Sequence, residues 1–138
     1  MKAHYIFYLL FSVFVINSCA TQRASSDSSA VIKPEKNQEG EWEILVFDTQ
    51  YDYFLNAIAK PQSMYNEQVL KARNQALVSE WNSYYYAGRY RNVIESAIEY
   101  DPNENYGLEF EYRLYQVFAF VQWKYGLRLR ALSGAEVR

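Results

Sequence analysis

The sequence predicts a mainly helical α+β fold, in a single small domain over residues 41–130 with three or four helices and one or two short strands. Apolar residues recur at helical spacing over the long stretches 64–87 and 107–125. A short β-branched and aromatic run, 42–47, opens the domain and is typical of a strand. A domain of about 90 residues supports one hydrophobic core. The chain's 14 Tyr, 8 Phe and 3 Trp would supply much of that core.

The first half of the domain is predicted to be a strand followed by two helices. Trp42–Phe47 has the residue types of a strand. Thr49 is expected to cap a short helix over 49–59, which a proline then ends. Ser63 is expected to cap a long helix over 64–87, because its apolar residues form one stripe and a glycine follows it.

The second half of the domain is predicted to centre on one buried helix. Residues 91–100 fit either a helix or a loop, and Asp101–Asn105 predicts a turn. Residues 107–125 are apolar on most sides, which is typical of a helix buried on several faces. Leu127–Arg130 alternates in polarity, so we expect a short strand that pairs with Trp42–Phe47.

The N-terminal end has the layout of a bacterial lipoprotein signal peptide. Lys2 supplies positive charge, Tyr5–Ile16 is almost wholly apolar, and Cys19 follows. We therefore expect Met1–Ser18 to be removed and Cys19 to become the lipidated N-terminus. A plain secretory signal cut elsewhere is one alternative. A retained membrane anchor is another, but an apolar run of about a dozen residues is shorter than the roughly 20 that a spanning helix needs.

The segments that flank the domain are expected to lack a core of their own. Residues 19–40 are polar and charged, with Pro and Gly, and predict a flexible linker behind the lipid; residues 131–138 predict a C-terminal tail. No acidic run follows Cys19, so we expect the periplasmic face of the outer membrane rather than the cell surface. The chain's net charge of −2 leaves no basic excess for phosphates, which argues against binding to nucleic acid.

The expected cleavage would remove most catalytic chemistry from the chain. The one histidine, His4, lies in the predicted signal, and the one cysteine, Cys19, would carry the lipid. Without imidazole or a free thiol, Ser-His-Asp and Cys-His catalysis are excluded. The usual zinc, haem and iron–sulfur sites are excluded for the same reason. We therefore expect no catalytic residues and no cofactor, which favours a protein that is not an enzyme.

The densest group of side chains suited to binding lies at the end of the long predicted helix. Its members are Trp81, Asn82, Tyr84, Tyr85, Tyr86 and Tyr90. Three consecutive tyrosines cannot all face one core on a helix, so at least one is exposed or at an edge. Exposed Tyr and Trp dominate binding hot spots. The alternative interpretation is that these rings close a small aromatic core.

A second pattern, at Asp101–Gly107, has alternating oxygen side chains as in a calcium loop. Asp101, Asn103 and Asn105 would be the ligands. The glycine comes one position late, and Tyr112 stands where a bidentate Glu belongs. We therefore predict no metal, with a calcium-stabilised structural module as an alternative. The simpler interpretation is an Asx turn in which Asn103 or Asn105 caps the last helix.

Carboxylates near aromatic residues are the remaining candidates for chemistry on glycans. Glycoside hydrolysis needs two carboxylates about 5–10 Å apart across a cleft. Glu95 and Glu99 would share a face if their segment is helical, and Glu80 lies beside Trp81 and one turn before Tyr84. Solvated helix faces explain both arrangements more simply.

Several short phrases, in this order and spacing, resemble a family of small uncharacterised lipoproteins from Bacteroidetes-type bacteria. They are Trp42–Asp48, Ala59–Pro61, Ser79–Asn82, Tyr100–Asn103, Tyr106–Glu109 and Lys124–Gly126. The resemblance covers roughly residues 42–129. It implies an envelope lipoprotein with a domain of unknown function, and it implies no activity.

The sequence thus predicts a membrane-tethered envelope lipoprotein that acts as a binding or scaffold module. The expected partners are the membrane, through lipidated Cys19, and a protein of the envelope. The alternative is a protein that binds or cleaves glycan or peptidoglycan, using Trp81, Tyr84 and Glu80.

Overall fold

The structure is a computed structural model that describes residues 34–46 and 48–132. The predicted signal peptide, Cys19 and residues 133–138 lie outside the described residues. The elements are β1 (Pro34–Lys36), β2 (Trp42–Ile44), α2 (Thr49–Ala57), a 3-10 turn η1 (Gln62–Met64), α3 (Glu67–Tyr86) and α4 (Leu108–Tyr125). This is a small, mainly helical α+β domain, so the predicted fold class is confirmed. In the described ranges no helix is long and apolar enough to cross a membrane.

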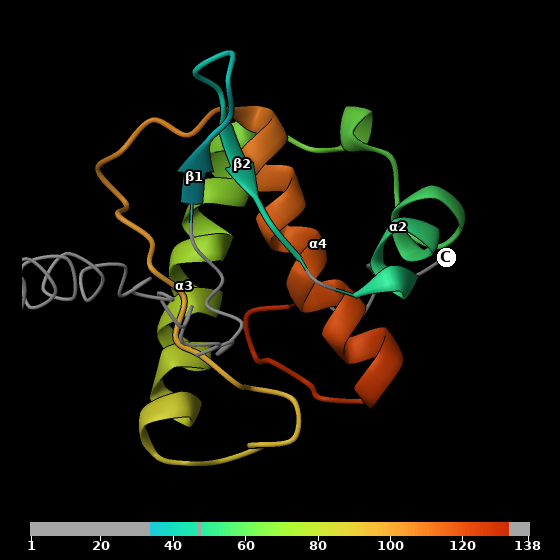
Figure 1. The fold of residues 1–138 in the computed structure, drawn as a ribbon, viewed down its shortest axis with the longest axis vertical. Coiled ribbons are helices and arrows are strands. Elements are labelled where there is room, and N and C mark those ends of the chain that lie inside the picture. Colours follow the sequence, from blue (N-terminus) through green and yellow to red (C-terminus); the bar gives the residue numbers. More distant parts are fainter. Residues whose placement is uncertain (1–33, 47, 133–138) are drawn as a thin grey trace, which may run out of the picture.

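Helix α4 is the element against which the others pack. It begins after Gly107 and ends at Gly126, whose left-handed backbone (φ +69°) forms the C-cap. Almost every residue from Phe110 to Val121 is buried, as the apolar pattern predicted. Helices α2 and α3 and strand β2 all contact it, and Figure 1 shows α4 running between α3 and α2.

The small sheet is a hairpin, in which β2 lies within the predicted strand Trp42–Phe47 but the predicted partner of that strand was wrong. β1 pairs antiparallel with β2, with Pro34 opposite Ile44 and Lys36 opposite Trp42. Residues 127–130, the expected partner, form no strand. β1 instead comes from residues that we expected to belong to the flexible linker.

The turn between the strands explains this pairing. The Asn37 side-chain oxygen accepts hydrogen bonds from the backbone N–H groups of Glu39 and Glu41, both at 3.0 Å. Gly40 supplies the left-handed position, with φ +83°. A local turn therefore brings a polar segment against β2 without any apolar pattern in β1.

Both predicted N-caps were wrong, by one residue in α2 and by three residues in α3. Asp48, not Thr49, caps α2 by accepting a hydrogen bond from the Gln50 N–H at 2.9 Å. Asp48 also forms an ion pair with Lys124, at 2.6 Å, and so joins the start of α2 to the end of α4. Asn66, not Ser63, caps α3, because it already satisfies two N–H groups of the first turn.

Residues 91–100 form a loop, not a helix, which settles the alternative left open by the sequence. Side chains of α3 hold this loop by its backbone. The Trp81 indole N–H donates to the Ser96 carbonyl at 2.8 Å. Asn82 accepts from the Ile98 N–H at 2.8 Å and donates to its carbonyl at 2.9 Å. Ile94 and Ile98 are buried, so the apolar residues of this segment anchor a loop that folds back on α3.

Candidate binding site at the end of helix α3

The end of α3 reverses the chain sharply and begins the candidate site. The Gly88 N–H donates to the Tyr85 carbonyl, and the Arg89 N–H donates to the Tyr84 carbonyl, both at 2.9 Å. This pair of bonds is a Schellman motif, and it needs the left-handed backbone that Gly88 adopts (φ +65°). Tyr90 is also left-handed (φ +53°), which is uncommon for a residue other than glycine. Two successive reversals therefore return the chain toward α3.

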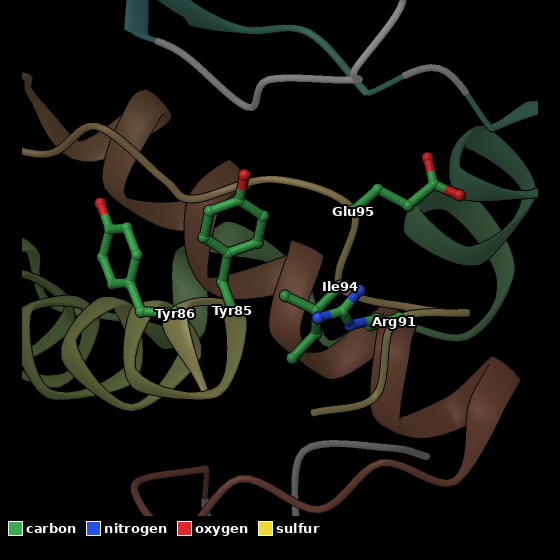
Figure 2. Close-up of a pocket in the computed structure, with 5 residues that line it drawn as sticks. All are labelled: Tyr85, Tyr86, Arg91, Ile94 and Glu95. Carbon is green, nitrogen blue, oxygen red and sulfur yellow. The ribbon is translucent and has the colours of Figure 1, made fainter. Parts of the chain in front are cut away.

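This return creates a pocket, named here the α3-end pocket. Its lining residues are Tyr85, Tyr86, Arg91, Ile94 and Glu95, and its volume is about 540 Å³. Figure 2 shows the two tyrosine rings standing side by side on α3, with the other three residues on the facing loop. Tyr86 is 77% exposed, whereas Ile94 is buried. The two ring centroids lie 5.3 Å apart at 67°, so the rings do not form one flat surface.

Two residues that line the α3-end pocket, Arg91 and Glu95, carry opposite charges, and both are exposed. The Arg91 Nε donates to the Gly88 carbonyl at 3.2 Å, and its guanidinium lies where a Cβ on residue 88 would come within 2.6 Å of it. Across the described residues, the Tyr85 and Tyr86 hydroxyls and the Glu95 carboxylate make no hydrogen bond or ion pair. The two tyrosine hydroxyls and the Glu95 carboxylate are therefore open to a ligand, whereas the Arg91 Nε is already bonded to Gly88.

A network of contacts joins the last turns of α3 to the chain reversal. The Tyr84 hydroxyl donates to Glu80 at 2.7 Å, and this hydrogen bond raises the pKa of Tyr84. The second Glu80 oxygen accepts from the Arg130 N–H at 2.8 Å. The Arg89 guanidinium lies 4.8 Å from the Tyr84 ring centroid and 5.2 Å from that of Tyr90. These residues position the pocket and do not line it.

The six residues singled out from the sequence therefore separate into three roles. Trp81 is only 2% exposed, and together with Asn82 it holds the loop. Tyr84 and Tyr90 contact each other, with ring centroids 5.2 Å apart, and do not line the pocket. Tyr85 and Tyr86 line it.

Three lining residues, Arg91, Ile94 and Glu95, were not proposed as a site with the tyrosines. The sequence signal that would have found them is Gly88, because a helix that ends in a glycine reversal brings the following residues back beside its last turn. The possible helix over 91–100 obscured that relation.

The residues suggested for a glycan site already have internal partners. Both Glu80 oxygens accept hydrogen bonds, from Tyr84 and from the Arg130 backbone. The Trp81 ring is buried. Glu95 and Glu99 lie on a loop, so they do not share a helix face.

The Asp101–Gly107 segment forms a turn closed by its own side chains. One Asp101 oxygen accepts from the Asn103 backbone N–H at 2.8 Å and from the Asn103 side chain at 3.0 Å. Neither Asn103 nor Asn105 caps α4, whose N-cap is Gly107 without a side-chain bond. Within 34–46 and 48–132, no group of three or more His, Cys, Asp or Glu residues is placed to hold a metal ion.

A buried polar cluster between α3 and α4 escaped the sequence analysis. Glu111 is 1% exposed. It accepts hydrogen bonds from Asn74 at 2.7 Å and from the Tyr100 hydroxyl at 3.0 Å. Burial raises the pKa of Glu111, while these hydrogen bonds oppose the rise. Burial also raises the pKa of Tyr100, which keeps its hydroxyl a donor. Helical periodicity would have found this cluster, because Glu111 lies among the buried positions of α4.

The fold is a small α+β domain, and the α3-end pocket has an aromatic lining with one charge of each sign. The chain belongs to a family of unknown function, DUF6146, whose model matches residues 6–137. The resemblance to an uncharacterised family is thereby confirmed. No curated protein and no solved structure matches the chain.

Proposed function

We propose that this chain is an outer-membrane lipoprotein, anchored through lipidated Cys19 on the periplasmic side, whose domain binds another envelope protein through the α3-end pocket. In this role the domain is a binding or scaffold module and not an enzyme. The signal-like N-terminus, with its apolar run before Cys19, supports the anchor.

The observation that carries the binding role is the state of Tyr85 and Tyr86. Both rings lie at the mouth of a pocket, and neither hydroxyl has a partner in the part of the chain that the structure describes. A Tyr ring that is rigid and exposed, with a free polar tip, is the kind of residue that dominates protein–protein hot spots. Arg91 and Glu95 add one charge of each sign, which suits the polar rim of an interface.

The rigidity of the facing loop supports the same proposal. Trp81 and Asn82 hold its backbone with three hydrogen bonds. A site that is already formed loses little conformational entropy on binding, which favours affinity.

The pocket geometry favours a protein partner over a glycan. Sugar rings stack on flat aromatic faces, whereas the Tyr85 and Tyr86 rings meet at 67° and leave a notch. A notch with one cation and one anion beside it suits an inserted side chain of a partner. Catalysis on a glycan would also need a second carboxylate, and Glu95 is the one carboxylate among the five lining residues.

The test is an in-cell crosslink and pull-down of the tagged chain in mild detergent. Tyr86→Ala is expected to reduce recovery of a specific protein by about tenfold or more, because truncating a hot-spot residue costs about 2 kcal/mol or more. Tyr53→Ala is the matched control, since Tyr53 is 59% exposed but lies on α2. Equal loss in both variants, or in neither, would contradict the proposed site.

The anchor is tested separately with Cys19→Ser. We expect this variant to lose labelling by a fatty-acid precursor, to leave the membrane fraction and to lose the partner. A variant that remains lipid-labelled would refute the anchor while leaving the pocket proposal standing. If the chain were retained on purified peptidoglycan and no partner protein were recovered, the result would favour a pocket that binds glycan.

A further inference from the structure

A second pocket, which has different lining residues, has a different chemistry. It lies between the hairpin and the turn that leads into α4, and its volume is about 450 Å³. It is named here the hairpin pocket, and it is lined by Pro34, Trp42, Glu99, Tyr100, Asp101 and Tyr106. None of these residues lines the α3-end pocket.

The aromatic wall of the hairpin pocket is a set of rings in mutual contact. Trp42 meets Tyr106 edge to face, with centroids 5.0 Å apart. Tyr106 is stacked between Tyr100 at 5.2 Å and Phe110 at 4.4 Å. These contacts fix the orientation of three rings that come from the hairpin and from the turn.

Hydrogen bonds hold the polar parts of the same wall. The Tyr106 hydroxyl accepts from the Asp101 N–H at 3.0 Å. The Tyr100 hydroxyl donates to buried Glu111. The Asp101 side chain is held in turn by the two hydrogen bonds from Asn103. The pocket therefore carries a carboxylate in a fixed position beside fixed aromatic rings, which reduces the entropy lost on binding.

One contact shows which chemistry this wall attracts. The ammonium group of Lys36 lies 4.7 Å from the centroid of the Trp42 ring. The two residues are opposite each other across the β1–β2 ladder. A cation over an aromatic face is attracted by the negative potential of that face, and the attraction grows when several rings and a carboxylate surround the cation. Trp42 already makes this contact with a primary ammonium of its own chain.

We propose that the hairpin pocket binds a primary alkylammonium group, of the kind carried by a lysine side chain, against Trp42 and Tyr100, whose orientations Tyr106 fixes, with Asp101 as its counter-charge. This site is independent of the α3-end pocket. It gives the domain a second recognition element, specific for a cationic side chain.

The test is a titration of the full chain, purified in mild detergent and labelled with ¹⁵N, with N-acetyl-lysine methylamide. We expect saturable shifts of the Trp42 indole signal and of the backbone signals of 99–106. The matched ligand N-acetyl-norleucine methylamide has the same chain without the ammonium group, and we expect no such shifts from it. Equal shifts from both ligands would overturn the proposal, because they would show apolar contact alone.

Two charge variants make the test specific. Asp101→Asn retains a side chain that can close the Asx turn but removes the counter-charge, so the lysine ligand is expected to bind about threefold more weakly. Asp52→Asn on α2 makes the same change in net charge away from the pocket and is expected to have no effect. If both variants weakened binding equally, the effect would come from net charge alone, and the assigned role of Asp101 would be wrong.

A third variant is predicted to act in the opposite direction. Lys36→Gln removes the intramolecular ammonium from the Trp42 ring together with a like charge near the pocket. We expect the lysine ligand to bind roughly twofold more tightly to this variant. Unchanged or weaker binding would contradict the proposal.

Discussion

The tyrosines of the interior and those at the end of α3 differ in what their hydroxyls contact. Tyr51 is buried, and its hydroxyl donates to the Arg113 carbonyl at 2.8 Å, which joins α2 to α4. Tyr85 and Tyr86 are exposed, and across the described residues their hydroxyls have no partner. The same residue type is therefore structural in one region and available for binding in the other.

The carboxylates show the same difference. Glu111 is buried between α3 and α4 and accepts hydrogen bonds from Asn74 and Tyr100. Glu95 is exposed beside the α3-end pocket. Burying a carboxylate without a partner is costly, so buried Glu111 has hydrogen-bond donors around it, whereas Glu95 is exposed to solvent. Substitutions in the interior should therefore reduce stability, and substitutions in the pocket should reduce binding.

The largest expected effect is that of Trp81→Ala. It removes a buried ring that packs on Phe118, with centroids 5.8 Å apart, and it also removes the hydrogen bond to Ser96. We expect a loss of about 3–5 kcal/mol in the free energy of unfolding. Tyr86→Ala, the matched change at the exposed site, should stay within about 0.5 kcal/mol of the parent chain. Urea unfolding, followed by circular dichroism, measures the free energy of unfolding of both variants. Similar losses in the two would contradict the difference between the interior and the pocket.

An intermediate effect is expected for Tyr51→Phe, which removes only a hydroxyl. The ring stays packed on Phe120, but the hydrogen bond to Arg113 is lost. We expect a loss of about 1 kcal/mol. Tyr85→Phe removes an exposed hydroxyl and should leave the unfolding midpoint unchanged. A Tyr85→Phe effect as large as that of Tyr51→Phe would show that the exposed hydroxyl has a structural role after all.

The smallest change in the free energy of unfolding is expected for Glu111→Gln at acid pH. Under that condition Glu111 is protonated, and Gln resembles the protonated acid. Burial raises the pKa of Glu111 above its ordinary value of 4.5, so the folded chain binds its proton more tightly than the unfolded chain does. Stability of the parent chain therefore falls as pH rises from the unfolded to the folded pKa, and it stays lower above that window. Glu111→Gln should lack this fall and should be at least as stable as the parent at neutral pH.

Urea unfolding midpoints measured across that pH window test this prediction. Glu95→Gln, which changes an exposed carboxylate, serves as the control and should keep the fall of the parent chain. If the stability of Glu111→Gln still fell with rising pH, the fall would have to come from another titrating group.

The sequence predicted the helices best where glycines mark their ends. Gly88 and Gly126 both have left-handed backbones at the ends of α3 and α4, and both predicted ends lie within one residue of those observed. The N-caps were less certain, since Asp48 and Thr49 are adjacent and both are good caps. Which of the two residues becomes the N-cap depends on the path of the chain before the helix, and the local sequence does not determine that path.

The features that the sequence did not reveal depend on contacts between distant segments. β1 has no apolar alternation, because a three-residue strand at an edge needs none. Glu111 occupies a buried position of its helix, but its hydrogen-bond partners Asn74 and Tyr100 come from other segments. Trp81 was assigned to a binding surface because its own helix does not show that the 94–98 loop covers it. In each case the partner is set by the tertiary fold.

The central place of α4 has a consequence for how the chain folds during its synthesis. The hairpin, α2 and α3 are all made before Leu108–Tyr125 leaves the ribosome, yet each of them packs on that helix. Until α4 emerges, the apolar faces of α2, α3 and β2 lack the helix on which they pack. We therefore expect these earlier segments to fold stably only after α4 has been made.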